Sequence, residues 1–453
     1  MRLAVPAALG VLAVVFLSAT RAGNPPSGSG RRSFPPRVVA GDEPHYLLAT
    51  SAILHGELTS VRPAYARVRG GGHDAGLRFA GVSLDHHTLI VAPGQAGPVF
   101  WRDAYQWWKP RDCVGPECTP FIPAGPDHDD VPGVREVPSH PLAFPLLIAA
   151  LVAPFTRDPD RVEWLAITWN AVLAWLATLA VYGAARGAGF PRGRALAAAV
   201  VCGIASPLLA YGRGYFSDAA TACALAMAAW LFFRGRLELS GVVCALAFAL
   251  KPPFVLAGAS LVADRLLARR WREALRLGVP LAVGVALTLG ATQLLAGTPL
   301  ISGTNRWTFA RGLGSLGNTL FGRTAGLLPF VPWAAFGLVA AVKGTLAPKT
   351  PGAAPTPGRA LGPGVLGYLL LLALRADDAG DGWGPRYWVA WLPWLALLAV
   401  DLAGRGGRWR RMLLALLVAW AIPISLAGAF RYPSVWMRTP WETVRTQWRW
   451  LPG

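Results

Sequence analysis

Long apolar segments recur along the chain and are separated mostly by short polar loops. A helix that crosses a membrane needs about 20 largely apolar residues. Segments that meet or approach this length lie near residues 3–20, 163–185, 195–213, 215–233, 277–296, 325–342, 360–375, 387–403 and 412–430. The pattern predicts an all-α polytopic membrane protein.

Two further apolar stretches contain proline and need a separate interpretation. Residues 240–264 are interrupted by Lys251-Pro252-Pro253, and two successive prolines remove two backbone donors and clash with the preceding turn. We expect two short helices that meet at a turn there, which brings the count to about eleven transmembrane helices. The stretch Leu142–Phe155 is only about 14 residues long and carries two prolines, so we expect an interfacial or re-entrant helix.

Loop charges predict how these helices are oriented. The formal net charge is +19 and 54% of the residues are apolar, more than one soluble core requires. The basic residues gather in short loops, where they indicate topology and not a nucleic-acid surface. The loops predicted to be cytoplasmic carry Arg186, Arg192 and Arg194, then Arg234 and Arg236, then Arg265 to Arg276, then Lys343, Lys349 and Arg359, then Arg405 to Arg411.

This alternation divides the chain into four predicted parts. Residues 1–20 form the first transmembrane helix, with a cytoplasmic N-terminus, and residues 21–162 form a large extracytoplasmic loop with juxtamembrane helices. Residues 163–430 form the multi-helix transmembrane domain, and residues 431–453 an extracytoplasmic tail. The first apolar segment also fits a cleaved signal peptide. Either alternative leaves the loop outside.

The large loop holds most of the polar chemistry, including fourteen of the 24 acidic residues. Its Cys113 and Cys118 lie in a compartment that favours a small disulfide loop over free thiols. His73-Asp74, Asp85-His86-His87 and Asp127 to Asp130 offer metal ligands without a specific spacing. We therefore expect no cofactor and no resident metal, with a divalent cation as the alternative. The Pro/Gly/Ala-rich residues 344–358 are typical of a flexible linker.

An adjacent acidic pair, Asp42 and Glu43, opens a short helix just after the first apolar segment. Carboxylates held beside a bilayer suggest chemistry at the membrane surface on a lipid-borne substrate. The structural alternative is a helix cap, because Asp42 precedes Pro44 at the helix start and a carboxylate there satisfies free backbone N–H groups.

Four stretches, in a familiar order, resemble a known family. They are Gly41-Asp42-Glu43-Pro44-His45-Tyr46-Leu47, His140-Pro141-Leu142-Ala143-Phe144-Pro145, Lys251-Pro252-Pro253 and Gly382-Trp383-Gly384-Pro385-Arg386-Tyr387-Trp388. The layout is similar to bacterial membrane glycosyltransferases of the GT-C fold, near the protein O-mannosyltransferase and aminoarabinose transferase superfamily. The resemblance implies an inner-membrane enzyme, a polyprenyl-phosphate sugar donor and an acidic residue of the first outer loop that activates the acceptor.

Glycosyl transfer from a lipid phosphate needs a base for the acceptor hydroxyl and cations for the departing phosphate. Asp42 is the candidate base and Glu43 a second carboxylate that orients substrate. Arg386 and Lys251 are candidates for the phosphate, because an arginine fork holds two phosphate oxygens and Lys251 is a charge inside an apolar stretch. Arg213 is a third candidate.

Each cation also has a structural alternative. Arg386 could snorkel at a membrane edge, Lys251 could cap the Pro-Pro turn, and Arg213 could form a plain salt bridge with Asp218. The motif residues His45, Tyr46, His140 and Tyr387 complete the predicted site.

The expected partners are the polyprenyl-phosphate sugar donor and membrane lipid, with no nucleic acid, and the acceptor is not identified. The rival function is a lipid or solute transporter or flippase, which would also be polytopic and bind lipid phosphate. Transporters bury coupling residues near the membrane midplane, and only Lys251 with its Pro-Pro break fits that description. A non-catalytic scaffold would not need the acidic pair.

Overall fold

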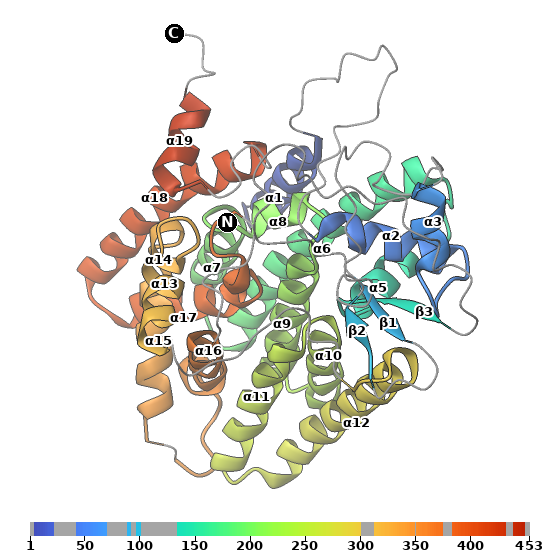
Figure 1. Ribbon diagram of the computed structural model, residues 1–453. Coiled ribbons are helices and arrows are strands. Elements are labelled where there is room, and N and C mark those ends of the chain that lie inside the picture. Colours follow the sequence, from blue (N-terminus) through green and yellow to red (C-terminus); the bar gives the residue numbers. More distant parts are fainter. Residues whose placement is uncertain are drawn as a thin grey trace. The chain divides into compact units, whose positions relative to one another are not determined.

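The computed structural model describes residues 4–21, 42–69, 88–91, 97–100, 134–299, 312–348, 350–374, 383–431 and 438–448 (Figure 1). The predicted Cys113–Cys118 pair and the His and Asp groups between residues 73 and 130 lie outside these ranges. The described chain is mostly helical, and it divides into two compact units. One unit comprises residues 1–38, 170–285 and 305–453, and the other residues 39–169 and 286–304.

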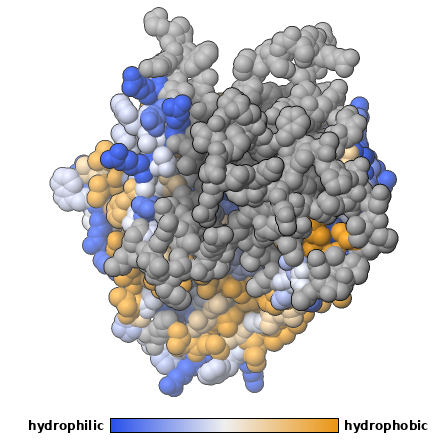
Figure 2. Space-filling model, in the orientation of Figure 1, coloured by the Kyte–Doolittle hydropathy of each residue, from blue (hydrophilic) through white to orange (hydrophobic). Residues whose placement is uncertain are grey.

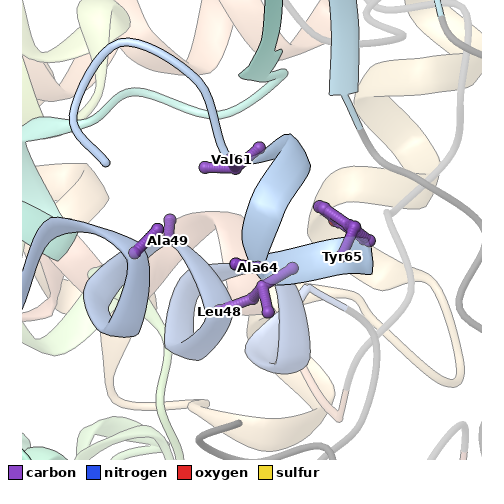
Figure 3. Packing of buried hydrophobic residues seen from close by; sticks show 6 residues of the cluster. Leu48, Ala49, Val61, Ala64 and Tyr65 are labelled. Carbon is purple, nitrogen blue, oxygen red and sulfur yellow. The ribbon is translucent and has the colours of Figure 1, made fainter. Parts of the chain in front are cut away.

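The smaller unit joins three short helices, a small sheet and parts of two long helices. Its elements are α2 (Glu43–Leu54), α3 (Arg62–Arg69), β1 (Thr88–Val91), β2 (Val99–Phe100), β3 (Arg135–Pro138), α5 (Ala143–Val152), the start of α6 (Pro159–Gly187) and the end of α12 (Trp271–Ala296). Helix α2 packs on α3 through Leu48, Ala49, Ala52, Val61, Ala64 and Tyr65 (Figure 3). Burying these side chains against each other removes apolar surface from water, which holds the two helices together.

The sheet has the order β2-β1-β3, and both strand pairs are antiparallel. Leu89 pairs with Val137, and these two side chains pack with Ala296 at the end of α12. The Glu136 carbonyl accepts the Val61 N–H at 2.8 Å, which ties the sheet to the start of α3. The prediction of an all-α chain did not include this sheet, because its strands are short and lie within a polar loop.

The larger unit is built from helices. They are α1 (Ala4–Arg21), α7 (Arg192–Ile204), α8 (Leu208–Arg213), α9 (Ser217–Phe233), α10 (Leu237–Leu250), α11 (Val255–Leu267), α13 (Gly312–Phe321), α14 (Leu327–Phe330), α15 (Ala334–Leu346), α16 (Pro357–Ala373), α17 (Leu392–Arg405), α18 (Arg408–Arg431) and α19 (Pro440–Trp448), with the rest of α6 and α12. Two 3₁₀ helices, η3 (Pro252–Phe254) and η4 (Arg386–Trp391), precede α11 and α17. Helix α17 packs against α7, α9, α15, α16 and α18.

Four helical segments are long and apolar enough to cross a membrane by length and composition: Arg161–Gly187, Trp271–Ala296, Arg386–Arg405 and Arg408–Phe430. Shorter apolar helices accompany them, so the described chain has the helices of a membrane protein. The predicted number of about eleven transmembrane helices is not confirmed and stays a prediction. Helix α5, within the stretch predicted to be too short to span, has 10 residues.

Proline decides where several apolar segments break. The predicted turn at Lys251-Pro252-Pro253 is confirmed, because α10 ends at Leu250 and η3 begins at Pro252. Two segments predicted as continuous helices, 195–213 and 325–342, are instead divided into α7 and α8 and into α14 and α15. The breaks lie at Pro207 and Pro332, where the ring removes a backbone donor and clashes with the preceding turn.

The apolar helices differ in how much of their surface is covered. In η4 and α17 together, 83% of the apolar stretch is buried inside the protein, whereas in α12 only 11% of the apolar stretch is buried. The exposed apolar residues of α12 include Leu275, Val279, Val283 and Leu287, which recur every fourth position and form one face. Figure 2 shows apolar residues gathered on the lower part of the displayed surface. Such a face suits lipid, as expected of a membrane protein.

A buried ionic network joins α11 and α16, and Arg265 of α11 also bonds to Glu273 of α12. The Asp264 carboxylate is fully buried and accepts hydrogen bonds from Arg265 and, at 2.7 Å, from Arg359 Nε. Arg359 also donates to the carbonyls of Ala353 and Ala354, and the Gly352 N–H donates to the Ala268 carbonyl. Residues 352–354 of the predicted flexible linker 344–358 are therefore held by a backbone hydrogen bond and by the Arg359 side chain, which the composition did not indicate.

Candidate functional site

The acidic pair lies at the start of α2 in the smaller unit. The Asp42 carbonyl accepts the Tyr46 N–H, which begins the helix, and Pro44 follows in the first turn. The Asp42 side chain makes no capping hydrogen bond. Its Oδ1 lies instead 3.6 Å from Nε2 of His140, just before α5. The helix-cap alternative is therefore wrong for this carboxylate, and two of the predicted motifs are adjacent in space.

Exposure separates the two carboxylates of the pair. The Asp42 side chain is 21% exposed, whereas Glu43 is completely buried. A base must reach the hydroxyl whose proton it takes, so Asp42 suits that role better than Glu43. Glu43 remains in the predicted supporting role.

Aromatic and histidine side chains near Asp42 contact one another. The rings of Tyr46 and His140 lie 5.1 Å apart, and the Tyr46 ring meets Phe144 of α5 edge to face. His45 Nδ1 lies 2.9 Å from the hydroxyl of Tyr65 on α3. The sequence predicted His45, Tyr46 and His140 for the site and did not select Tyr65, which contacts His45 and also packs in the core between α2 and α3.

A second group of charges lies in the larger unit and centres on Asp218. This aspartate belongs to the first turn of α9, where a negative charge is favoured by the helix dipole, and it is 1% exposed. Lys251 Nζ lies 2.5 Å from its Oδ1, and Arg386 Nε lies 3.5 Å from its Oδ2. The Arg386 guanidinium also stacks over the Phe216 ring at 4.3 Å. Two predicted cations thus share one buried carboxylate.

Both cations lie at breaks in helical structure. Lys251 is extended (φ −154°) between the end of α10 and the prolines of η3. Arg386 opens η4 after a turn in which Gly384 has a φ of +62°, a conformation that favours glycine. A Cβ at Gly384 would also lie 3.1 Å from the Phe330 ring. The glycine and proline residues of these motifs therefore determine where each cation is placed.

The remaining predicted residues have other contacts. Arg213, at the end of α8, is 4% exposed and donates to the Ala429 carbonyl in α18 at 2.7 Å. The Tyr387 carbonyl accepts a hydrogen bond from the Tyr368 hydroxyl. From the sequence we expected Asp218 mainly to pair with Arg213, whereas in the structure Lys251 and Arg386 pair with it. The feature of the sequence that marks Asp218 is its position as an acidic residue at the end of an apolar segment.

The described residues include no group of three or more His, Cys, Asp or Glu side chains that could hold a metal ion. The predicted site residues fall in two units: Asp42, Glu43, His45, Tyr46 and His140 lie in the smaller unit, and Lys251, Arg386, Arg213 and Tyr387 in the larger one. In the larger unit, Lys251 and Arg386 share Asp218. Comparison of the chain with family models, curated proteins and solved structures finds no match to any of them.

Proposed function

We propose that this protein transfers a sugar from a polyprenyl-phosphate-linked donor to an acceptor hydroxyl at a membrane surface. The observation that carries the proposal is the meeting of Lys251 and Arg386 at Asp218. The three side chains have a formal charge of +1, two positive and one negative, and they are largely buried. An anion such as a phosphate is attracted to buried charges far more strongly than to the same charges exposed to water.

The cations suit the leaving group of the reaction. As the bond between the anomeric carbon and the phosphate oxygen breaks, its electron pair stays with the phosphate, and negative charge develops there. Cations already in position stabilise that charge without reorganising. Arg386 contributes planar donors that suit phosphate oxygens, and Lys251 contributes a compact point charge.

The carboxylate of Asp42 suits the other half of the reaction. The acceptor oxygen forms a bond to the anomeric carbon while its proton passes to Asp42, which is partly exposed and is not used to cap α2. His140 Nε2 lies 3.6 Å from this carboxylate, just beyond hydrogen-bond distance. Membrane helices agree with a lipid-linked donor.

The test measures donor cleavage by the purified protein with labelled polyprenyl-phosphate sugars. We expect Asp42→Asn to lower transfer by on the order of 10²-fold or more, the usual scale for a positioned base, with donor binding kept. Glu43→Gln should be less damaging, because Glu43 is buried. A folded Asp42→Asn protein with full transfer activity would remove Asp42 from the mechanism.

The same preparation distinguishes the transporter alternative. A transporter in vesicles would move the labelled lipid between leaflets without cleaving it. The donor bond would then stay intact with the parent protein and with the Asp42→Asn variant alike. Cleavage that depends on Asp42 supports the transferase.

A further inference from the structure

Trp383 is fixed from four sides, three residues before Arg386. Its indole is fully buried and meets the Phe330 ring edge to face at 5.5 Å. It also packs directly on Gly428 of α18, where any side chain would overlap the ring. Its Nε1 donates to the Thr443 hydroxyl at 3.2 Å, and its carbonyl accepts the Tyr211 hydroxyl at 2.8 Å.

These contacts bear directly on the turn that carries Arg386. The turn is short, with Gly384 at a positive φ and the Arg386 N–H donating to the Gly384 carbonyl. A change in the orientation of the Trp383 peptide therefore moves the backbone from which the guanidinium extends. Tyr211 also contacts Phe216, the ring beneath that guanidinium, at 5.4 Å between centroids.

The C-terminal helix α19 supplies the hydroxyl on the other side. Thr439 and Glu442 form a capping box: the Thr439 N–H donates to the Glu442 carboxylate, and the Glu442 N–H donates to the Thr439 hydroxyl. Thr443 lies in the next position, is completely buried, and donates its own hydroxyl proton to the Thr439 carbonyl. Its oxygen is thereby oriented to accept from Trp383.

We infer that Thr443 and Tyr211 are positioning residues that hold Arg386, through Trp383, in the geometry that binds the donor phosphate. The inference rests on the proposed function, since it assigns Arg386 to phosphate. It gives α19 an indirect role in donor recognition, through Trp383 and Arg386 and without a contact to the phosphate. The physical basis is that Trp383 is restrained by its hydrogen bonds with Thr443 and Tyr211 and by its close packing. These restraints limit the turn before Arg386 to one backbone conformation.

The experiment measures binding of polyprenyl phosphate and of the matching polyprenol to the full chain in nanodiscs. The affinity for polyprenyl phosphate divided by the affinity for polyprenol isolates the contribution of the phosphate. We expect Thr443→Val, which keeps the shape and removes the hydroxyl, to reduce this ratio about threefold to tenfold, the scale of one or two hydrogen bonds. Thr443→Ser should restore it. Thr178→Val is the matched control, because the buried Thr178 hydroxyl donates to the Trp175 carbonyl of its own helix, α6.

Tyr211→Phe tests the same turn from the opposite side and keeps the test decisive if Thr443→Val does not fold. Arg386→Ala reports on the proposed function itself. An unchanged ratio in Arg386→Ala would overturn the phosphate assignment and with it this inference. A reduced ratio in Arg386→Ala, with unchanged ratios in folded Thr443→Val and Tyr211→Phe, would overturn the positioning role alone. Reduced ratios in all three, with Thr443→Ser and Thr178→Val unchanged, support it.

Discussion

Replacing Asp218 by Asn removes the charge that Lys251 and Arg386 share while keeping the size of the side chain. Asp218 is 1% exposed, and the two cations have side chains that are 20% and 8% exposed. The formal charge of the three side chains then rises from +1 to +2. We expect the variant to be less stable and to bind lipid phosphate more tightly.

The magnitude follows from burial. Removing one partner of a buried ion pair costs about 3–5 kcal/mol, because the remaining charge is left uncompensated in a medium of low polarity. The partial exposure of Lys251 places Asp218→Asn near the lower end of that range. A ligand that binds only the folded state adds about 2.7 kcal/mol of stability when present at a hundred times its Kd. Lipid phosphate at that concentration should therefore bring the variant close to the stability of the ligand-free parent.

The assay is thermal unfolding in detergent with and without polyprenyl phosphate. Asp264→Asn is the matched control, because Asp264 is also buried between two cations, Arg265 and Arg359. Both variants should unfold at a lower temperature than the parent. Only Asp218→Asn should gain more from the lipid phosphate than the parent does. Equal gains in the two variants would refute the anion site, and an Asp218→Asn protein as stable as the parent would refute the burial argument.

Three further predictions concern packing, pH and topology. Gly428→Ala should lower the free energy of unfolding by about 1–3 kcal/mol, the usual range for overpacking, because its methyl group would overlap Trp383; unchanged thermal unfolding would contradict this. Hydrogen bonds from Thr439 hold the pKa of Glu442 below its usual value. The ionised Glu442 carboxylate therefore contributes to stability above about pH 4.3, and this contribution is lost as the pH falls through the lowered pKa. The difference in unfolding temperature between the parent and Glu442→Gln should shrink over that fall in pH; a constant difference would contradict this. A cysteine at Arg192 should resist an impermeant thiol reagent in intact cells and react after lysis; labelling before lysis would reverse the predicted topology.

Several features of the fold could be predicted because they depend on neighbouring residues. The break at Lys251 follows from the two prolines after it, which cannot donate hydrogen bonds wherever the chain folds. The length of α5 follows from the short apolar stretch that contains it. The breaks at Pro207 and Pro332 had the same cause, but there the apolar pattern outweighed a single proline in the prediction.

The candidate site was predictable only in part. Asp42 and Lys251 stood out because a charged group beside or inside an apolar segment is unusual, whereas His140 and Arg386 came from the motifs that resemble the glycosyltransferase family. That Asp42 faces His140 and does not cap α2 could not be predicted, since both arrangements suit an aspartate before a proline. The preference of a side chain between two partners depends on what the rest of the fold brings within reach.

The amino-acid sequence alone indicates a helical, largely apolar chain and identifies the residues that carry charge beside its apolar segments. Hydropathy and proline act over a few neighbouring residues, so these properties do not depend on the fold. The folded chain was needed to show that Lys251 and Arg386 share Asp218 and that Thr443 contacts Trp383. These contacts join residues far apart along the chain, and they exist because the helices pack in one particular arrangement.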